Sequence, residues 1–136
     1  MKTFLGLGSN LGNKERNIET AIQLISERVG LLTAKSSFYY SSPQGFESEH
    51  QFVNAVVVVE TLLQPLELLN ILQHIEKDLG RTSKSANGQY ADRIIDIDIL
   101  LFDDVIVDLP ELKIPHPQMK KRDFVTKPLN EILGLT

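Results

Sequence analysis

The stretch FVNAVVVVETL, residues 52–62, decides the architecture that the sequence predicts. β-Branched residues dominate it, which is typical of a β-strand. Side chains alternate between the two faces of a strand, so the unbroken valines at 56–59 make both faces apolar. A strand with two apolar faces belongs to a sheet that is covered on both sides. We therefore expect helices on both faces of a central sheet, or helices on one face and another layer on the other.

Amphipathic and β-rich segments alternate along the rest of the chain. Helices are predicted at 14–28 and 65–79 from their apolar spacing, and a terminal helix at 119–133 is expected to be broken by Pro128. Strands are predicted at residues 2–8, 32–40, 52–62 and 96–102, with a hairpin return at 105–109. The order β-α-β-β-α-β predicts an α+β fold, a ferredoxin-like (split βαβ) antiparallel sheet layered with helices.

Length and composition set the broad class of the protein. The 136 residues are 42% hydrophobic and 24% charged, which predicts one globular domain spanning residues 1–136. The sequence has no apolar stretch of transmembrane length and no signal-peptide core. We therefore expect a cytoplasmic protein that has no membrane partner. The absence of cysteine excludes disulfides and thiolate chemistry. The formal charge of −4 argues against nucleic-acid binding, and a monomer is expected.

Two aspartates interrupt the aliphatic stretch RIIDIDILLF, residues 93–102. Asp96 and Asp98 point to the same face of the predicted strand, about 7 Å apart. Burying two unpaired carboxylates is costly, and a divalent cation such as Mg²⁺, which prefers carboxylate oxygens, removes that cost. The alternative is that the strand lies at an edge and that both side chains face water.

Basic side chains surround this strand in the sequence. They are Arg81, Lys84 and Arg93 before it, and His116, Lys120, Lys121 and Arg122 after it. Guanidinium groups match phosphate oxygens, so the combination predicts a metal–polyphosphate site. The alternative is that these are solvated surface charges, and for any single lysine that explanation is favoured. That explanation is weakest for Arg93, three residues before Asp96.

A second candidate pocket begins at Phe52 and Asn54, which share one face of their strand. An aromatic plane beside an amide suits a flat heterocycle with donors and acceptors at its edge. Tyr90 and Phe124 are candidates for further planes. For either phenylalanine alone a place in the core is favoured, whereas an asparagine among valines must have its amide hydrogen-bonded.

Three further features are open to two interpretations. Gln73 and Glu76 lie on one face of the second predicted helix and either bind a ligand or face water. His116 sits between two prolines, which would hold its ring in place. The glycine-rich stretch 6–12, GLGSNLG, lacks the spacing of a phosphate-binding loop, and a strand end with a tight turn is favoured.

Six stretches together resemble the 6-hydroxymethyl-7,8-dihydropterin pyrophosphokinases (HPPK) of folate biosynthesis. They are GLGSNLG, SSFYYSSPQG, FVNAVV, ELLNILQHIEKDLGR, DRIIDIDILLF and IPHPQMKKRDFVTKPLNEI, which occur in the family's order over nearly the whole chain. The resemblance implies a ferredoxin-like enzyme that moves the β,γ-pyrophosphoryl unit of ATP to the hydroxymethyl oxygen of 6-hydroxymethyl-7,8-dihydropterin. The products would be the pterin diphosphate and AMP.

The resemblance also implies roles for individual residues. Two Mg²⁺ ions would be held with ATP by Asp96 and Asp98. The catalytic set would comprise those two aspartates with Arg81 and Arg93. ATP would be bound by Gln73, Glu76, Lys84, Ile99, His116 and Arg122. The pterin would be bound by Ser41, Ser42, Gln44, Phe52, Asn54, Tyr90 and Phe124.

The sequence departs from the family pattern next to the acidic strand. Tyr90-Ala91-Asp92 stands where the family usually has Trp-Gly-Pro, so Asp92 adds a negative charge near the expected phosphates. Two other functions are compatible with the same residues. A nucleotidyltransferase would also use strand carboxylates and metals but would release pyrophosphate, and a non-catalytic domain would bind ligands without turnover.

Overall fold

The structure, a computed structural model, describes residues 1–41, 52–80, 94–117, 119 and 123–134. Ser41, Asp123 and Phe124 are described by their backbone alone. The elements are β1 (Lys2–Ser9), α1 (Lys14–Arg28), β2 (Gly30–Lys35), β3 (Tyr39–Ser41), β4 (Phe52–Thr61), α2 (Pro65–Asp78), β5 (Asp96–Phe102), β6 (Val107–Leu109), β7 (Leu112–Ile114) and α3 (Asp123–Leu133).

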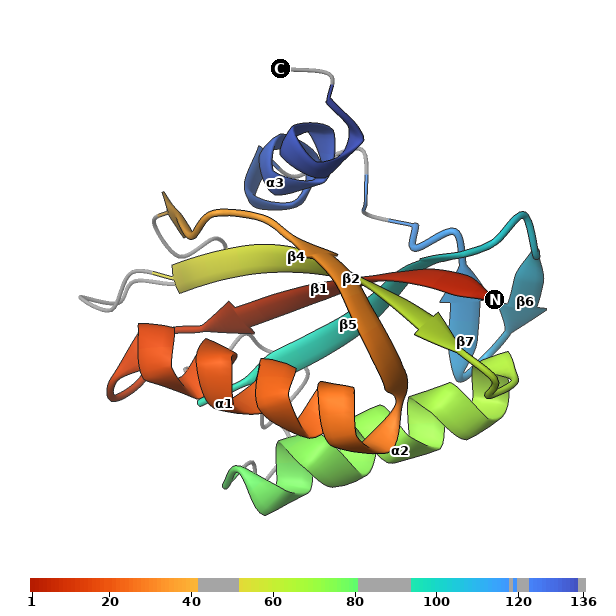
Figure 1. The fold of residues 1–136 in the computed structure, drawn as a ribbon, viewed down its shortest axis with the longest axis horizontal. Helices are drawn as coiled ribbons and strands as arrows, with labels where there is room; N and C mark the ends of the chain where they lie inside the picture. Colours follow the sequence, from red (N-terminus) through yellow and green to blue (C-terminus); the bar gives the residue numbers. More distant parts are fainter. Residues whose placement is uncertain (42–51, 81–93, 118, 120–122, 135–136) are drawn as a thin grey trace.

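The main sheet is antiparallel and follows the order β2-β4-β1-β5, with β3 extending the β2 side of β4. Helices α1 and α2 cover one face of this sheet, and α3 lies on the other face (Figure 1). Helix α1 connects β1 to β2 and helix α2 connects β4 to β5, and both pack on the same face of the sheet, which is the split βαβ arrangement. The α+β, ferredoxin-like fold predicted from the sequence is confirmed.

Strand β4 has the two apolar faces that its valines predict. Val57 and Val59 join the larger core, which lies against α1 and α2. Val56 and Val58 join a smaller core that includes Leu129 of α3. Because hydrophobic groups are removed from water on both faces, this strand is the centre of the three-layer arrangement.

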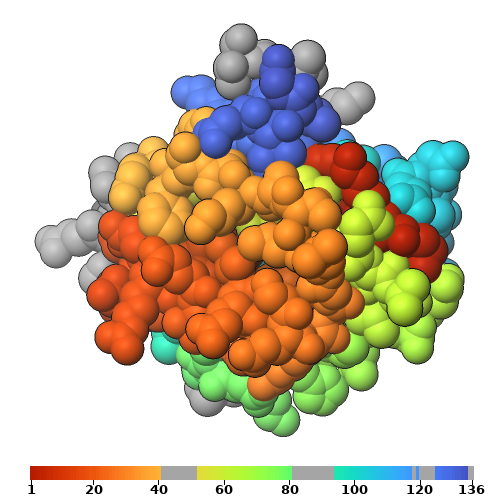
Figure 2. Space-filling view, viewed as in Figure 1, coloured from red at the N-terminus to blue at the C-terminus, as the bar shows by residue number. Residues whose placement is uncertain are grey.

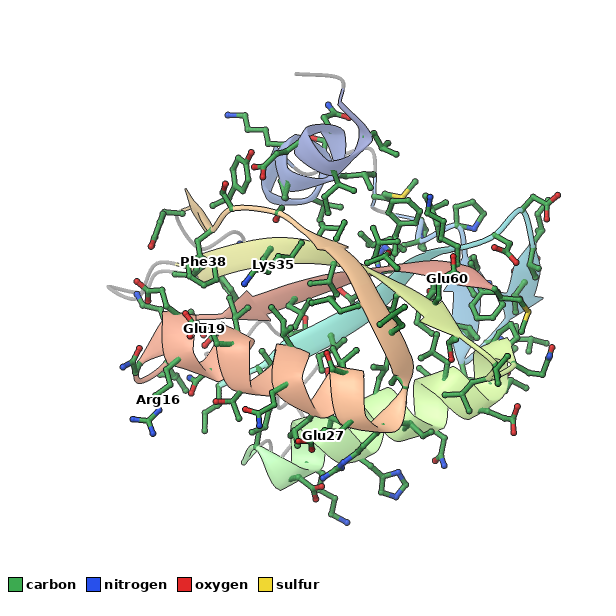
Figure 3. The ribbon with its side chains drawn as sticks, viewed as in Figure 1. Arg16, Glu19, Glu27, Lys35, Phe38 and Glu60 are labelled. Atoms are coloured by element: carbon green, nitrogen blue, oxygen red, sulfur yellow. The ribbon has the colours of Figure 1, made fainter. Side chains whose placement is uncertain are left out.

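Helix α1 is amphipathic. Ile18, Ala21 and Ile25 are buried against the sheet, whereas Arg16 and Glu27 are exposed and point away from it (Figure 3). The turn before α1 is the stretch that resembles a phosphate loop. Gly12 has φ +67° there, a left-handed conformation that glycine adopts without strain, and the Asn13 side chain accepts a hydrogen bond from the Arg16 N–H at 3.2 Å. The tight turn favoured from the sequence is therefore what the structure contains.

The strand predicted at 32–40 is divided into β2 and β3. Ser36 causes the interruption, because its N–H donates to the Val56 carbonyl at 2.8 Å and its hydroxyl accepts from the Val56 N–H at 2.9 Å. A side-chain oxygen thus replaces a backbone acceptor of the ladder. In the space-filling view this segment, coloured orange, lies below α3 (Figure 2).

Two predictions about the C-terminal third were wrong. Residues 107–109 pair with β7, not with β5, because the turn at Asp103 is fixed to β1: the Asp103 N–H donates to the Lys2 carbonyl and its carboxylate accepts from the Lys2 N–H, both at 2.7 Å. Helix α3 starts at Asp123 and continues through Pro128 without a break. None of the helices in the described ranges is long and apolar enough to cross a membrane.

Candidate active site

The acidic pair lies at the start of β5, the last strand of the main sheet. Asp96 and Asp98 are half-buried and alternate with the buried Ile97 and Ile99, which join the core under α1 and α2. Both carboxylates therefore lie on the opposite face, the one that carries α3. The predicted placement on a single face is confirmed, and partial burial separates the pair from an ordinary solvated surface.

Helix α2 holds the acidic strand through Glu76. This side chain is 7% exposed, and its carboxylate accepts a hydrogen bond from the Ile97 N–H at 2.8 Å. Ile97 stands between the two aspartates, so the bond fixes the backbone that carries them. Gln73, one turn earlier on α2, is exposed. A ligand-binding role for either residue stays a prediction.

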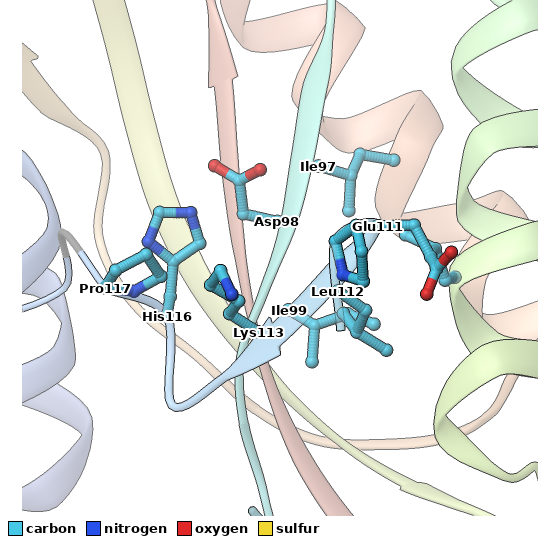
Figure 4. Close-up of a pocket in the computed structure, with 10 residues that line it drawn as sticks. Ile97, Asp98, Ile99, Glu111, Leu112, Lys113, His116 and Pro117 are labelled. Carbon is cyan, nitrogen blue, oxygen red and sulfur yellow. The ribbon is translucent and has the colours of Figure 1, made fainter. Parts of the chain in front are cut away.

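A hollow of about 240 Å³ lies beside β5 (Figure 4). The Asp98 carboxylate and the His116 ring lie on one side of it, and Glu111 lies on the other. Its remaining lining comes from Leu69, Ile97, Ile99, Pro110, Leu112, Lys113 and Pro117. The hollow combines apolar walls with two carboxylates, an imidazole and an ammonium group, which suits a ligand that has both an apolar part and charged groups.

His116 is held against β5 by its backbone. Its N–H donates to the Leu100 carbonyl at 3.0 Å, and its own carbonyl accepts from the Met119 N–H at 3.1 Å.

Lys113, which also lines the hollow, was not predicted from the sequence as a site residue. It forms an exposed ion pair with Asp108, with 2.6 Å between Nζ and Oδ1, which lowers the pKa of the Asp108 carboxyl.

The Phe52–Asn54 pair lies on the same face of the sheet as the aspartates. Asn54 is 6% exposed, and it stands opposite Gly8 of β1 on one side and Tyr39 of β3 on the other. Gly8 in turn stands opposite Asp96. The amide and the acidic pair are thus separated by one strand, a distance of about 10 Å at the usual strand spacing.

Glu131 of α3 ties that helix to the β2–β3 segment. Its carboxylate accepts hydrogen bonds from the Tyr39 hydroxyl at 2.7 Å, the Ser37 N–H at 2.9 Å and the Ser37 hydroxyl at 3.2 Å. The bonds from Tyr39 and Ser37 lower the pKa of the Glu131 carboxyl, and the same contact raises the pKa of the Tyr39 phenol. Sequence reasoning missed this connection, because the partners are 92 residues apart and no local pattern links them.

Many of the basic and loop residues that are predicted to bind the substrates lie outside the described residues. This holds for Arg81, Lys84, Arg93, Arg122, Ser42, Gln44 and Tyr90. Ser41 is placed by its backbone opposite Phe52, and Phe124 by its backbone in the first turn of α3. The structure therefore brings Asp98 and His116 together at the hollow, with Asp96 on the same face of β5 and with Phe52 and Asn54 across β1.

Comparison with known proteins places the chain in a family. The sequence model of the 7,8-dihydro-6-hydroxymethylpterin-pyrophosphokinase (HPPK) family matches residues 4–134. The 2-amino-4-hydroxy-6-hydroxymethyldihydropteridine pyrophosphokinase of Porphyromonas gingivalis is 50% identical over 130 residues, which cover 95% of this chain and 88% of that protein. The protein of the same name from Bacillus subtilis is 40% identical, covering 95% of this chain and 76% of that one.

Solved structures with a similar fold are longer proteins. A crystal structure of HPPK-DHPS in complex with substrates has a TM-score of 0.76 and 19% identity, covering 97% of this chain and 40% of that chain. Plasmodium falciparum HPPK-DHPS with pteroate has a TM-score of 0.76 and 19% identity, covering 95% and 38%. This chain thus spans about two fifths of those structures, and at such identity the likeness concerns the fold alone.

Together the fold, the acidic strand and the curated relatives define a class of protein, the pyrophosphokinases of folate biosynthesis. The chain belongs to the 7,8-dihydro-6-hydroxymethylpterin-pyrophosphokinase family. The family and the enzyme class predicted from the sequence are therefore confirmed.

Proposed function

We propose that this chain transfers the β,γ-pyrophosphoryl group of ATP to 6-hydroxymethyl-7,8-dihydropterin. The hydroxymethyl oxygen attacks the β-phosphorus, the bond from that phosphorus to the α,β-bridging oxygen breaks, and the hydroxyl proton passes to water. The products are AMP and the pterin diphosphate. The observation that carries the proposal is that Asp96 and Asp98 share a sheet face with Asn54, one strand away.

Asp96 and Asp98 would hold two Mg²⁺ ions together with the phosphates of ATP. Their fit rests on the donor set, because two half-buried carboxylates on one strand face supply the hard oxygen ligands that Mg²⁺ prefers. Among the described residues no group of three or more His, Asp or Glu side chains forms a complete metal cage. Such a partial set matches Mg²⁺, which usually takes one or two carboxylates and fills its other positions with phosphate and water. When bound, the ions neutralise phosphate charge and lower the pKa of the acceptor hydroxyl.

ATP would occupy the hollow beside β5. The Ile97 N–H points away from β1 to reach Glu76, and backbone direction repeats every second residue along a strand, so the backbone of Ile99 faces the same way. This supports a contact between Ile99 and the nucleoside, near Gln73 and Glu76. His116 lines the hollow and would contact the phosphates. Arg81, Lys84, Arg93 and Arg122 would complete the phosphate grip, with Arg81 and Arg93 stabilising the charge that develops during transfer.

The pterin would lie on the α3 face above β1 and β4. Phe52 and Phe124 would stack on the ring and Asn54 would read its edge, with Ser41, Ser42, Gln44 and Tyr90 adding contacts. The position of Ser41 opposite Phe52 and the start of α3 at Asp123 support this arrangement. We also propose that residues 1–136 work as a single monomeric domain in the cytoplasm, with neither nucleic acid nor membrane as a partner.

The test is product analysis. The protein is incubated with ATP, Mg²⁺ and 6-hydroxymethyl-7,8-dihydropterin, and nucleotides and pterins are separated by chromatography. The proposal expects AMP and pterin diphosphate in equal amounts, and no AMP when the pterin is omitted. Release of pyrophosphate would instead indicate nucleotidyl transfer, and the absence of turnover would indicate a binding domain; either result overturns the proposal.

A further inference from the structure

Glycines occupy one face of β1, the strand between the acidic pair and the amide. Leu5 and Leu7 point into the core under α1 and α2, so Gly6 and Gly8 lie on the α3 face. Gly6 stands opposite Val56 and Asp98, and Gly8 stands opposite Asn54 and Asp96. At these two positions β1 carries no side chain on the α3 face; the Leu100 side chain lies nearest to Gly6, and the proposed pterin residues Asn54 and Phe52 lie nearest to Gly8.

The two glycines differ in the space above them. A Cβ atom added at Gly8 would lie 2.7 Å from Oδ1 of Asn54, closer than two such atoms can approach. A Cβ added at Gly6 would lie 3.4 Å from Leu100 Cδ2, at the edge of ordinary contact distance. The Asn54 amide thus leans over Gly8 and fills the place that a side chain would take.

The atoms nearest to Gly8 also show what a side chain there would disturb. The three closest heavy atoms to an added Cβ belong to Asn54 and Phe52, the latter through Cδ1 at 3.7 Å. None of the three belongs to Asp96, although Asp96 is the register partner on the other side. A methyl group at this position would push on the Phe52–Asn54 pair and leave the carboxylates in place.

We propose that Gly8 is a specificity-determining position for the flat heterocyclic substrate, because its missing side chain lets Asn54 reach over β1 toward the substrate edge. This inference rests on the proposed function, in which Asn54 reads the pterin. The inference also assigns Gly8, in the GLGSNLG stretch, a role other than phosphate binding. Glycine weakens a strand interior, so its presence at a central position is explained by the room that the amide needs.

The experiment compares Gly8→Ala with the matched variant Gly6→Ala, which lies two residues earlier on the same face of β1. Binding of 6-hydroxymethylpterin and of the magnesium complex of α,β-methylene-ATP is measured separately by calorimetry, and melting temperatures are recorded. We expect Gly8→Ala to weaken pterin binding roughly tenfold or more, as the loss of one buried polar contact does, with nucleotide affinity changed by less than about twofold. Gly6→Ala should change neither affinity by more than about twofold.

A third comparison separates displacement of the amide from a general effect on the strand. In an Asn54→Ala background the amide is gone, so Gly8→Ala should weaken pterin binding no further. Equal losses of pterin and nucleotide affinity, a loss confined to the nucleotide, or an undiminished effect in the Asn54→Ala background would each overturn the inference. A wild-type protein that binds nucleotide but no pterin would overturn the proposed function, and this inference with it.

Discussion

The Tyr39 hydroxyl on β3 donates a hydrogen bond to the Glu131 carboxylate on α3, with 2.7 Å between the two oxygens. Tyr39 also stands opposite Asn54 in the β3–β4 ladder. A single carboxylate therefore connects the helix that begins at Asp123 with the strand that pairs with β4, which carries the proposed pterin amide. This contact joins α3 to the β2–β3 segment on the face of the sheet that carries α3.

We expect Glu131→Ala to lower the melting temperature by about 3–5 °C. The variant loses three hydrogen bonds, which together contribute roughly 1 kcal/mol once partial exposure is allowed for. Thermal unfolding followed by circular dichroism checks this. Glu19→Ala, an exposed change on α1, is the control and should leave the melting temperature within about 1–2 °C. Equal melting temperatures for the two variants would contradict the connecting role.

The same contact predicts a pH dependence. Because the folded protein lowers the pKa of Glu131, its contribution to stability is fully present above the ordinary glutamate pKa of about 4.3 and is lost as the pH falls through the lowered folded value. An amide resembles the protonated carboxyl group, so the free energy of unfolding of wild type should exceed that of Glu131→Gln at pH 7 and converge with it once the pH has fallen below the lowered pKa of Glu131. Urea unfolding at a series of pH values measures the difference, and a constant gap would refute the explanation.

We predict that the main role of Glu76 is to stabilise β5 through its hydrogen bond with the Ile97 N–H. Glu76→Ala leaves the buried Ile97 N–H without this acceptor and should lower the free energy of unfolding by about 1–3 kcal/mol. Glu76→Gln keeps an acceptor oxygen and should cost less than about half as much. The control Gln73→Ala, exposed on the same helix, should stay within about 0.5 kcal/mol of wild type. If Glu76→Ala were as mild as the control and raised only the KM for ATP, Glu76 would be a ligand contact alone.

Asp98→Ala should reduce turnover by orders of magnitude, about 10²-fold or more, because a proposed metal ligand is lost. Its melting temperature should be unchanged or higher, since two carboxylates on one strand face repel each other. Asp104→Ala, in the exposed turn after β5, should leave kcat unchanged. A large fall in the melting temperature of Asp98→Ala would show instead that this carboxylate supports the fold.

The fold was predictable where local pattern and tertiary packing agree. The valines of β4, the apolar stripes of α1 and α2, and the alternation of Asp96 and Asp98 with isoleucines each specify a burial pattern by themselves. The division at Ser36 and the pairing of β6 with β7 were not predictable in this way. Each depends on hydrogen bonds to a distant strand, between Ser36 and Val56 in one case and between Asp103 and Lys2 in the other.

The polar residues of the candidate site were predictable from the sequence, whereas the residues that hold the surrounding elements in place were less so. Carboxylates, an amide and an imidazole stand out in apolar or proline-rich surroundings, so Asp98, Asn54 and His116 could be named from the sequence. Glu131 could not, because a glutamate on a helix gives no sign of its partner. The sequence did mark Gly8, because glycines at alternate positions of a strand leave one face without side chains. The reason for that glycine becomes clear only in the structure, where the Asn54 side chain lies against it.

The central claim is that Asp96 and Asp98 together anchor the metal ions of the nucleotide. Its most direct test is a titration with Mn²⁺ in place of Mg²⁺, in the presence of α,β-methylene-ATP, with bound metal counted by electron paramagnetic resonance. Wild type should bind two ions per nucleotide complex, and Asp96→Asn and Asp98→Asn should each lose at least one or weaken it more than about tenfold. Unchanged stoichiometry and affinity in both variants would contradict the claim.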